Sequence, residues 1–314
     1  MIAVLAGGVG AARLLRGLVR TVDPASITAV VNVADDLVLH GLHISPDLDT
    51  VTYTLAGAVD AERGWGLTGE TWQAMAALER FGAPTWFNLG DRDLATHLHR
   101  TGRLADGATL STVTAEIARS WGLDLTLLPV SDDPVRTRVV VVDPDGPPEG
   151  TEVGFQEYFV QRHHDVPVRA VRFEGAAEAR PAPGVLDALA DAEVVIIAPS
   201  NPVVSIGPLL AVPGVADALA ARRRSVVAVS PLVAGAALKG PADRLMADLG
   251  QEPSAVGVAR AYAEVAGALV IDHADAELAG AGEQLGLRCT VTDTIMADAE
   301  RAEALARTTL DAAR

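Results

Sequence analysis

The start of the chain places apolar and polar residues in blocks that predict a strand, a turn, a helix and a second strand. Ile2–Ala6 is a short apolar run, and the glycine-rich stretch "GGVG" follows it. The next segment, "AARLLRGLVRTV", repeats leucine and valine at helical spacing. A second apolar run, Ile27–Val33, comes after it. This β-α-β order predicts a parallel sheet with helices packed on its faces.

The last third of the chain repeats the pattern. Apolar runs stand at Ala192–Pro199, Ser225–Pro231, Gly267–Asp272 and Leu287–Asp293, each with a helical segment before or after it. A strand that is covered on both faces is expected to be apolar throughout rather than alternating. We therefore predict an α/β protein with a doubly wound, mostly parallel, Rossmann-like sheet.

The middle of the chain breaks this pattern. It holds helical stretches and two alternating runs, "RTRVVVVD" and "VGFQEYFVQR", that predict a hairpin with its turn at Asp143–Gly150. We interpret residues 65–183 as an inserted α+β region. Residues 1–64 and 184–314 are then the nucleotide-binding core.

Charge and composition argue against several classes of ligand and binding site. The net charge of −16 over 314 residues argues against nucleic acid and against an anionic membrane surface. Of the 25 basic residues only Lys239 is lysine, so a Walker A lysine near the N-terminus is excluded. The single cysteine, Cys289, excludes a disulfide framework and a thiolate zinc site. No apolar run reaches the ~18 residues that a membrane span needs. We expect a cytoplasmic protein.

The glycine-rich turn is the first candidate site. A helix that begins after such a turn presents free N–H groups and the positive end of its dipole, which together bind phosphate. A nicotinamide site is disfavoured because Arg13 stands where the third small residue of that fingerprint belongs. A purely structural turn remains the alternative. The candidate phosphate-binding residues, for a nucleotide or another phosphorylated substrate, are Gly7, Gly8, Gly10 and Ala11.

Four carboxylates follow the second strand. Asp35 and Asp36 come just after the strand, and Asp47 and Asp49 return after a short loop. In an open α/β sheet, ligands bind beyond the carboxyl ends of the strands. Hard oxygen ligands beside a phosphate-binding turn suit Mg²⁺, so we predict a metal or substrate site here. The alternative is that these residues are caps and solvated charges, with Asp49 as the N-cap of a helix that begins near Val51.

Two other stretches place polar residues at predicted element ends. Asn88–Arg100, "NLGDRDLATHLHR", leads from a glycine turn into a helix, and a capping arrangement with a local Asp–Arg pair is its simpler explanation. His97 and His99 are two residues apart and do not share a helix face, which disfavours a paired zinc site. Ser200 and Asn201 end a predicted strand, where they could bind phosphate or ribose, or simply form a turn.

Together these segments resemble the 2-phospho-L-lactate transferase family of coenzyme F-420 biosynthesis, and within it the phosphoenolpyruvyl transferases of actinobacteria. The resemblance runs nearly from end to end. It is carried by "GGVGAARLLRGL", "VVNVADD", "SPDLDTVTYTLAG", "RGWG", "LGDRDLATH", "LPVSDDPVRT", "FQEYFV", "APSNPVVSIGP" and "VVAVSPLVAG", in this order.

The resemblance implies a reaction. A guanosine diphosphate-linked donor carries phosphoenolpyruvate or 2-phospholactate, the ribityl hydroxyl of the deazaflavin Fo attacks the distal phosphorus, and GMP leaves. It also implies Mg²⁺ and a homodimer. By the same resemblance Asp35 and Asp49 bind the metal, and Asp36 and Asp49 are the candidates for the catalytic base. The residues implied for the deazaflavin are Asn32, Asp49, Arg92 and His97, the inserted region contributing to that site.

Other functions stay open at this point. Related proteins with the same glycine turn and Asp-Asp strand end act as sugar-nucleotide-binding regulators. They would lack the acceptor motifs "PDLDT" and "LGDRDLATH", and both stand in this chain. The sequence does not decide between the enolpyruvyl and the lactyl group, and it does not locate a dimer interface.

Overall fold

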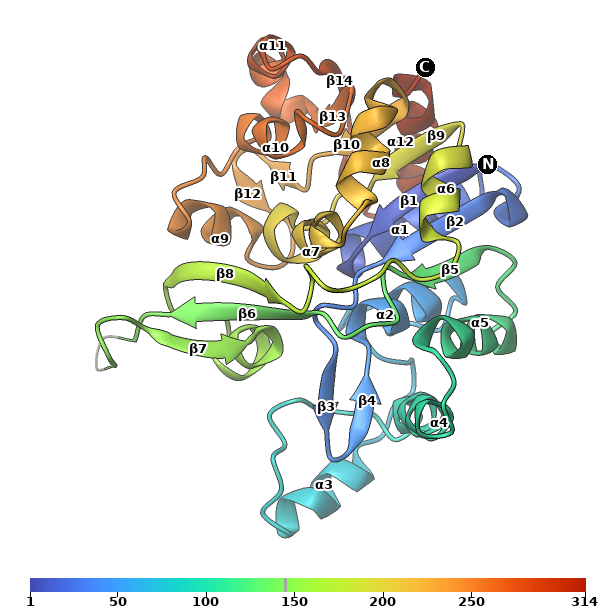
Figure 1. Cartoon of the computed structure of the whole chain (residues 1–314), viewed down its shortest axis with the longest axis vertical. Helices are drawn as coiled ribbons and strands as arrows, with labels where there is room; N and C mark the ends of the chain where they lie inside the picture. Colours follow the sequence, from blue (N-terminus) through green and yellow to red (C-terminus); the bar gives the residue numbers. More distant parts are fainter. Residues whose placement is uncertain (144–145) are drawn as a thin grey trace.

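A seven-stranded sheet forms the centre of the protein (Figure 1). The structure is a computed structural model that describes residues 1–143 and 146–314. Every neighbouring pair of strands in this sheet is parallel. The order is β14-β13-β10-β9-β1-β2-β5, which confirms the doubly wound α/β prediction. The strands are β1 (Ile2–Ala6), β2 (Ile27–Val31), β5 (Thr126–Pro129), β9 (Val194–Ile197), β10 (Val226–Val229), β13 (Ala268–Asp272) and β14 (Arg288–Thr292).

Helices cover both faces of this sheet. Helix α1 (Gly8–Leu18) packs against α12 (Ala299–Ala312) and α2 (Pro46–Leu55) on one face. Helices α6 (Val185–Asp191) and α8 (Val215–Ala221) pack together on the other face, in front of the strands in Figure 1. The remaining helices are α3 (Gln73–Arg80), α4 (Asp93–Ala105), α5 (Leu110–Ser120), α7 (Gly207–Ala211), α9 (Ala242–Asp248), α10 (Ala255–Tyr262) and α11 (Ala279–Gln284).

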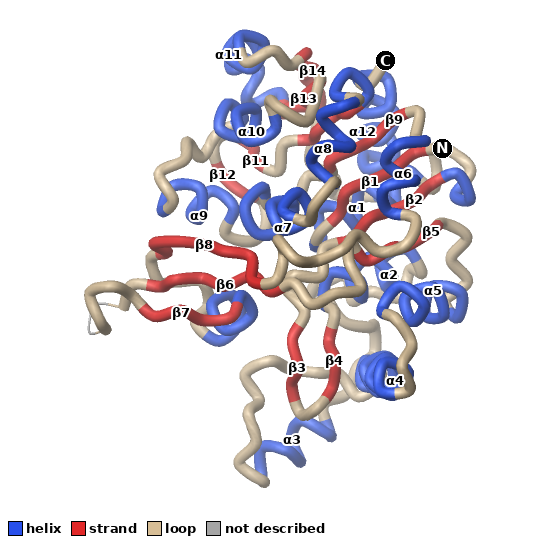
Figure 2. Tube along the Cα trace, viewed as in Figure 1, coloured by secondary structure: helices blue, strands red, loops and turns tan. Residues whose placement is uncertain are grey.

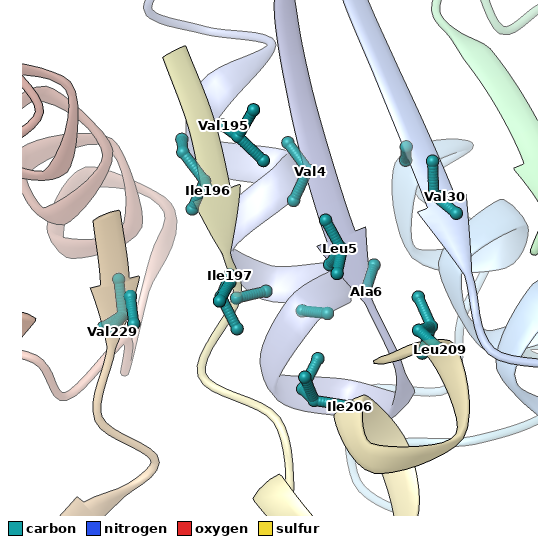
Figure 3. Packing of buried hydrophobic residues seen from close by; sticks show 14 of the residues in the cluster. Val4, Leu5, Ala6, Val30, Val195, Ile196, Ile197, Ile206, Leu209 and Val229 are labelled. Atoms are coloured by element: carbon teal, nitrogen blue, oxygen red, sulfur yellow. The ribbon is translucent and has the colours of Figure 1, made fainter. Parts of the chain in front are cut away.

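The core lies where the predicted apolar runs meet. All five residues of β1 are buried, and Val4 and Leu5 lie beside Val195 and Ile197 of the neighbouring strand β9 (Figure 3). Removing such a side chain from water stabilises the fold by about 1.5–3 kcal/mol. The sheet is therefore the buried platform of the fold, and the loops that connect its strands lie at its edge.

Three smaller antiparallel sheets are attached to this platform (Figure 2). The β3–β4 hairpin directly follows β2, and its turn uses His40 and Gly41, both with positive φ, as a tight hairpin turn requires. Strands β6, β7 and β8 form the second sheet, and β11 and β12 the third. The bounds are β3 (Leu37–Leu39), β4 (Leu42–Ile44), β6 (Arg136–Val141), β7 (Thr151–Gly154), β8 (Val168–Glu174), β11 (Leu232–Val233) and β12 (Ala236–Ala237).

Local predictions had mixed outcomes. The predicted hairpin exists, because β6 pairs antiparallel with β7, but its second strand ends at Gly154 and a π-helical turn follows at Glu157–Gln161. Residues 144 and 145 of its predicted turn lie outside the described residues. The helix expected to begin near Val51 begins at Pro46, since proline is well suited to the first turn of a helix. Strand β5, within 65–183, joins the edge of the main sheet.

Membrane-spanning potential is limited. Within residues 1–143 and 146–314, no helix by itself has the length and apolar character of a membrane span, although the bent pair Pro202–Ala211 and Val215–Ala221 passes on length and composition.

Candidate active site

The first part of the site is the point where the sheet order reverses. Strands β1 and β9 are neighbours there, and the strand order runs in opposite directions on either side of them, which is where open α/β sheets bind their ligands. Ser200, after β9, bridges to the glycine turn: its Oγ accepts from the Gly7 N–H at 3.3 Å and donates to the Gly7 carbonyl at 2.7 Å. Asn201 Oδ1 accepts from the Val203 N–H at 2.9 Å and caps the next turn. The two predicted donor-binding segments therefore meet.

The glycines of the turn have different neighbours. Gly8 has a φ of +71°, which favours glycine, and a Cβ on Gly7 would lie 2.8 Å from Ser205 Cβ. A Cβ on Gly10 would overlap the carbonyl oxygen of Pro199. Gly10 thus lets α1 pack closely against the end of β9, and this packing accounts for the glycine without any ligand.

The carboxylates gather beside this turn. Asp47 accepts from Asn32 Nδ2 at 3.0 Å, and its Oδ1 lies 3.8 Å from the position that a Cβ on Gly8 would take. Ser45 Oγ donates to Asp36 Oδ2 at 2.7 Å. Asp35 and Asp36 each keep one buried oxygen, Oδ1, that no group of the described residues hydrogen-bonds. The strand end after β2 and the start of α2 thus form one acidic cluster, as the sequence pattern predicted.

Burial makes the charges of this cluster costly. Desolvation, with the nearby Asp47 charge, holds the pKa of Asp35 well above its ordinary 3.8. Desolvation also raises the pKa of Asp36 to about 7, although Ser45 and Arg100 lower it in part. The pKa of Asp47 rises to about 6 for the same main reason. Throughout the described parts of the chain, no Arg, Lys or His lies within ion-pair distance of these three carboxylates. Unpaired buried oxygens with raised pKa values suit a bound cation.

Asp49 is in a different environment. Its Oδ2 lies 3.1 Å from Arg100 Nη1, its Oδ1 contacts Arg100 Nη2, and the Arg100 side chain is 2% exposed. Asp49, Asp93 and His97 bring three potential metal-ligating atoms within 4.8 Å of one another. However, the Arg100 guanidinium already supplies positive charge to this group. It occupies both Asp49 oxygens and lies 3.3 Å from His97 Nδ1. The acidic cluster around Asp35 therefore fits a metal better than this triad.

The whole chain matches one known family. Residues 2–311 match the model for "2-phospho-L-lactate transferase CofD". The chain belongs to this transferase family. The chain is 45% identical to the phosphoenolpyruvate transferase of Kitasatospora aureofaciens, covering 98% of this chain and 96% of that one. It is also 45% identical to the enzyme of that name from Streptomyces griseus, with 99% and 98% covered.

A solved structure supports the fold. A member of the UPF0052 family from Bacillus halodurans superimposes with a TM-score of 0.61, at 18% identity, over 98% of both chains. At that identity the likeness shows the architecture of this CofD-family chain and does not distinguish an enzyme from a regulator.

The motif "GDRD" leads into α4, which begins at its last residue, Asp93. Arg92 is exposed, and its Nη1 donates to the Thr68 carbonyl. Asp91 accepts from the N–H groups of Gln73 and Ala74 at 3.0 Å each and so caps α3. Asp91 therefore caps the earlier helix α3 rather than α4, and Arg92 contacts the Thr68 carbonyl instead of forming the expected Asp–Arg pair within the described residues. Whether Arg92 and His97 bind a deazaflavin stays a prediction.

Sequence reasoning missed part of the site. Tyr53 was not identified, and Asp93 and Arg100 were included only as part of the stretch Asn88–Arg100, although all three surround Asp49 and His97. The available signal was helical spacing, because Asp93, His97 and Arg100 recur at i, i+4 and i+7 on α4 and so share one face.

Proposed function

We propose that this CofD-family chain transfers a phosphoenolpyruvyl group from a guanosine diphosphate-linked donor to the ribityl hydroxyl of the deazaflavin Fo, in the cytoplasmic biosynthesis of coenzyme F-420. The observation that carries this proposal is the meeting of the glycine turn, the acidic cluster and Ser200 at the switch point of the sheet. The names of the two relatives favour the enolpyruvyl over the 2-phospholactyl group.

The donor half of the site is the glycine turn. The free N–H groups at the start of α1, with the buried Asn201 Nδ2 that has no partner among the described residues, are suited to the pyrophosphate. In this role Gly7, Gly8, Gly10 and Ala11 contribute backbone only, and Ser200 holds Gly7 in place.

The metal belongs to the acidic cluster. Asp35 is the ligand that fits best, because its Oδ1 is buried and has no hydrogen-bond partner among the described residues. Asp49 was the second predicted ligand, and it can take this role only through the acceptor capacity that Arg100 leaves free. When bound, Mg²⁺ would neutralise the pyrophosphate charge against a chain of net charge −16.

Asp36 is the better candidate for the catalytic base. The Fo hydroxyl oxygen forms a bond to the distal phosphorus, the bond from that phosphorus to the GMP oxygen breaks, and the hydroxyl proton must leave. Asp36 has a buried oxygen that no group in the described part of the chain hydrogen-bonds, whereas both oxygens of Asp49 contact Arg100. Ser45 holds the other Asp36 oxygen and thereby orients the carboxylate. Positioning and charge stabilisation supply most of the rate in such transfers.

GMP release tests the proposal. GMP should form only when protein, donor, Fo and Mg²⁺ or Mn²⁺ are all present, and it should stop when a chelator is added. Release without Fo would indicate a hydrolase. Tight binding of a sugar nucleotide with no GMP formed would favour the regulatory alternative. We also propose a homodimer, as the family resemblance implies, and light scattering would measure it.

A further inference from the structure

Buried polar side chains of α2 and α4 contact one another in a series that the backbone of α2 closes into a ring. From α2 come Asp49 and Tyr53, one helical turn apart, and from α4 come Asp93, His97 and Arg100. Arg100 Nη1 lies 3.1 Å from Asp49 Oδ2 and 3.3 Å from His97 Nδ1, and His97 Nε2 lies 3.2 Å from Asp93 Oδ2. The Tyr53 hydroxyl completes the series by donating to Asp93 Oδ1 at 2.6 Å.

The ring determines the tautomer of His97. An arginine side chain has only donors, so the His97 Nδ1 that faces Arg100 must be the acceptor. The proton of the neutral ring is then on Nε2, which lies 3.2 Å from Asp93 Oδ2 without forming a hydrogen bond among the described residues. Arg100 thus orients the His97 ring, and the imidazole is 1% exposed.

The ring also links the two helices, α2 and α4, whose starts carry the residues proposed for the acceptor site. Helix α2 carries the carboxylates Asp47 and Asp49 in its first turn, and α4 begins directly after Arg92. A rotation of either helix would move Asp49 relative to Arg92. Because Arg100 contacts both Asp49 oxygens, it is the member that controls the direction of this carboxylate.

We propose that Arg100 is a positioning residue for the group transfer: its guanidinium orients the Asp49 carboxylate, and the ring through His97, Asp93 and Tyr53 holds α2 and α4 in register. The kinetic part of this proposal rests on the proposed function. The ring itself does not, so the two are tested by separate measurements.

The kinetic test replaces Arg100 by lysine, which keeps the charge but cannot contact both oxygens in the same way. Arg100→Lys should lower kcat about tenfold to a hundredfold, with GDP affinity by calorimetry unchanged. The matched control is Arg103→Lys, three residues along the same helix, where a half-exposed arginine holds Glu116 through two contacts of 2.8 and 3.0 Å. This control should keep the parental kcat. A parental kcat in folded Arg100→Lys overturns the proposal.

A second variant covers the case in which Arg100→Lys does not fold. Tyr53→Phe removes only the hydroxyl that donates to Asp93. We expect a smaller loss of kcat, about threefold to tenfold, with parental GDP affinity. A parental kcat in this variant would then overturn the role of the ring.

The structural test needs no substrate. Imidazole ¹⁵N spectra should show His97 protonated on Nε2, with an Nδ1 signal that moves in Arg100→Lys and stays in Arg103→Lys. An Nδ1-protonated ring contradicts the proposal even if the enzyme is active. If the parent forms no product but the His97 signals are as expected, the proposed function fails and the ring stands.

Discussion

Replacing Asp35 by asparagine should make the metal-free protein more stable and the enzyme nearly inactive. Asp35 is a buried carboxylate beside Asp47 and Asp36, and none of the three has a basic partner within ion-pair distance in the described residues. The substitution keeps the size of the side chain and removes one of three costly charges. By contrast, replacing a buried aspartate that accepts hydrogen bonds or forms an ion pair would lower the stability of the folded protein.

The magnitude follows from the raised pKa values. A carboxyl whose pKa rises from 3.8 to about 7 on folding, as for Asp36, costs on the order of 4 kcal/mol when ionised at pH 8. The pKa of Asp35 is raised for the same reasons, and its loss also relieves repulsion of Asp47. The folded state binds the extra proton, so for Asp36 this cost is absent below about pH 4, grows as pH rises from about 4 to about 7, and is complete at pH 8. We expect Asp35→Asn to gain a few kcal/mol at pH 8, an increase of about 2–5 °C in Tm.

Thermal unfolding in a chelator measures this effect. The stability difference between variant and parent should be small at pH 4 and largest at pH 8. Addition of Mg²⁺ should stabilise the parent by mass action but not the variant, and turnover of the variant should fall by ~10²-fold or more. If Asp35→Asn were equally or less stable than the parent at pH 8, the Asp35 charge would not destabilise the metal-free protein.

Asp272→Asn is the matched control. Asp272 is equally buried, at the end of β13, but although burial alone would raise its pKa, hydrogen bonds from the backbone of Ala274 and Thr294 lower it. Its replacement should therefore destabilise the protein, by about 1.5–3 kcal/mol for a lost hydrogen bond to a charge.

Three further predictions use other residues. Arg92→Ala should weaken Fo binding in a fluorescence titration and leave GDP affinity nearly intact; equal Fo affinity would remove Arg92 from the acceptor site. Asp49→Asn should lower turnover by ~10²-fold and weaken Fo binding, and it should also cost about 3–5 kcal/mol of stability by leaving Arg100 buried without its partner, as urea unfolding would measure. In a chelator, the parent should lose stability from about pH 4 to pH 7, because the pKa values of Asp36 and Asp47 are raised to about 7 and about 6; a flat profile would contradict this.

The sheet and the acidic cluster were predictable for simple reasons. A strand covered on both faces is a continuous apolar run, which is how β1, β9 and β10 were recognised. Carboxyl ends of parallel strands share one edge of the sheet, so Asp35 after β2 and Ser200 after β9 were expected to lie beside the glycine turn.

The missed features depend on contacts between distant segments. Arg100 reaches Asp49 across 51 positions of sequence, and this pairing follows from how α4 packs against β4 and α5. The close packing at Gly10 depends in the same way on a residue that is distant in the sequence, Pro199. The start of α2 was a local error, because Pro46 was interpreted as a loop residue although proline is also common at the first helical position.

The mass of the product tests most directly whether the protein transfers a phosphoenolpyruvyl group to Fo. The protein would be incubated with Fo, Mg²⁺ and either the phosphoenolpyruvate-linked or the 2-phospholactate-linked guanosine diphosphate donor, and the products separated and weighed by mass spectrometry. We expect an Fo adduct joined through a phosphodiester to the enolpyruvyl group, formed in equal amount with GMP. An unchanged Fo mass with both donors, in protein that binds GDP and Mg²⁺, would contradict it.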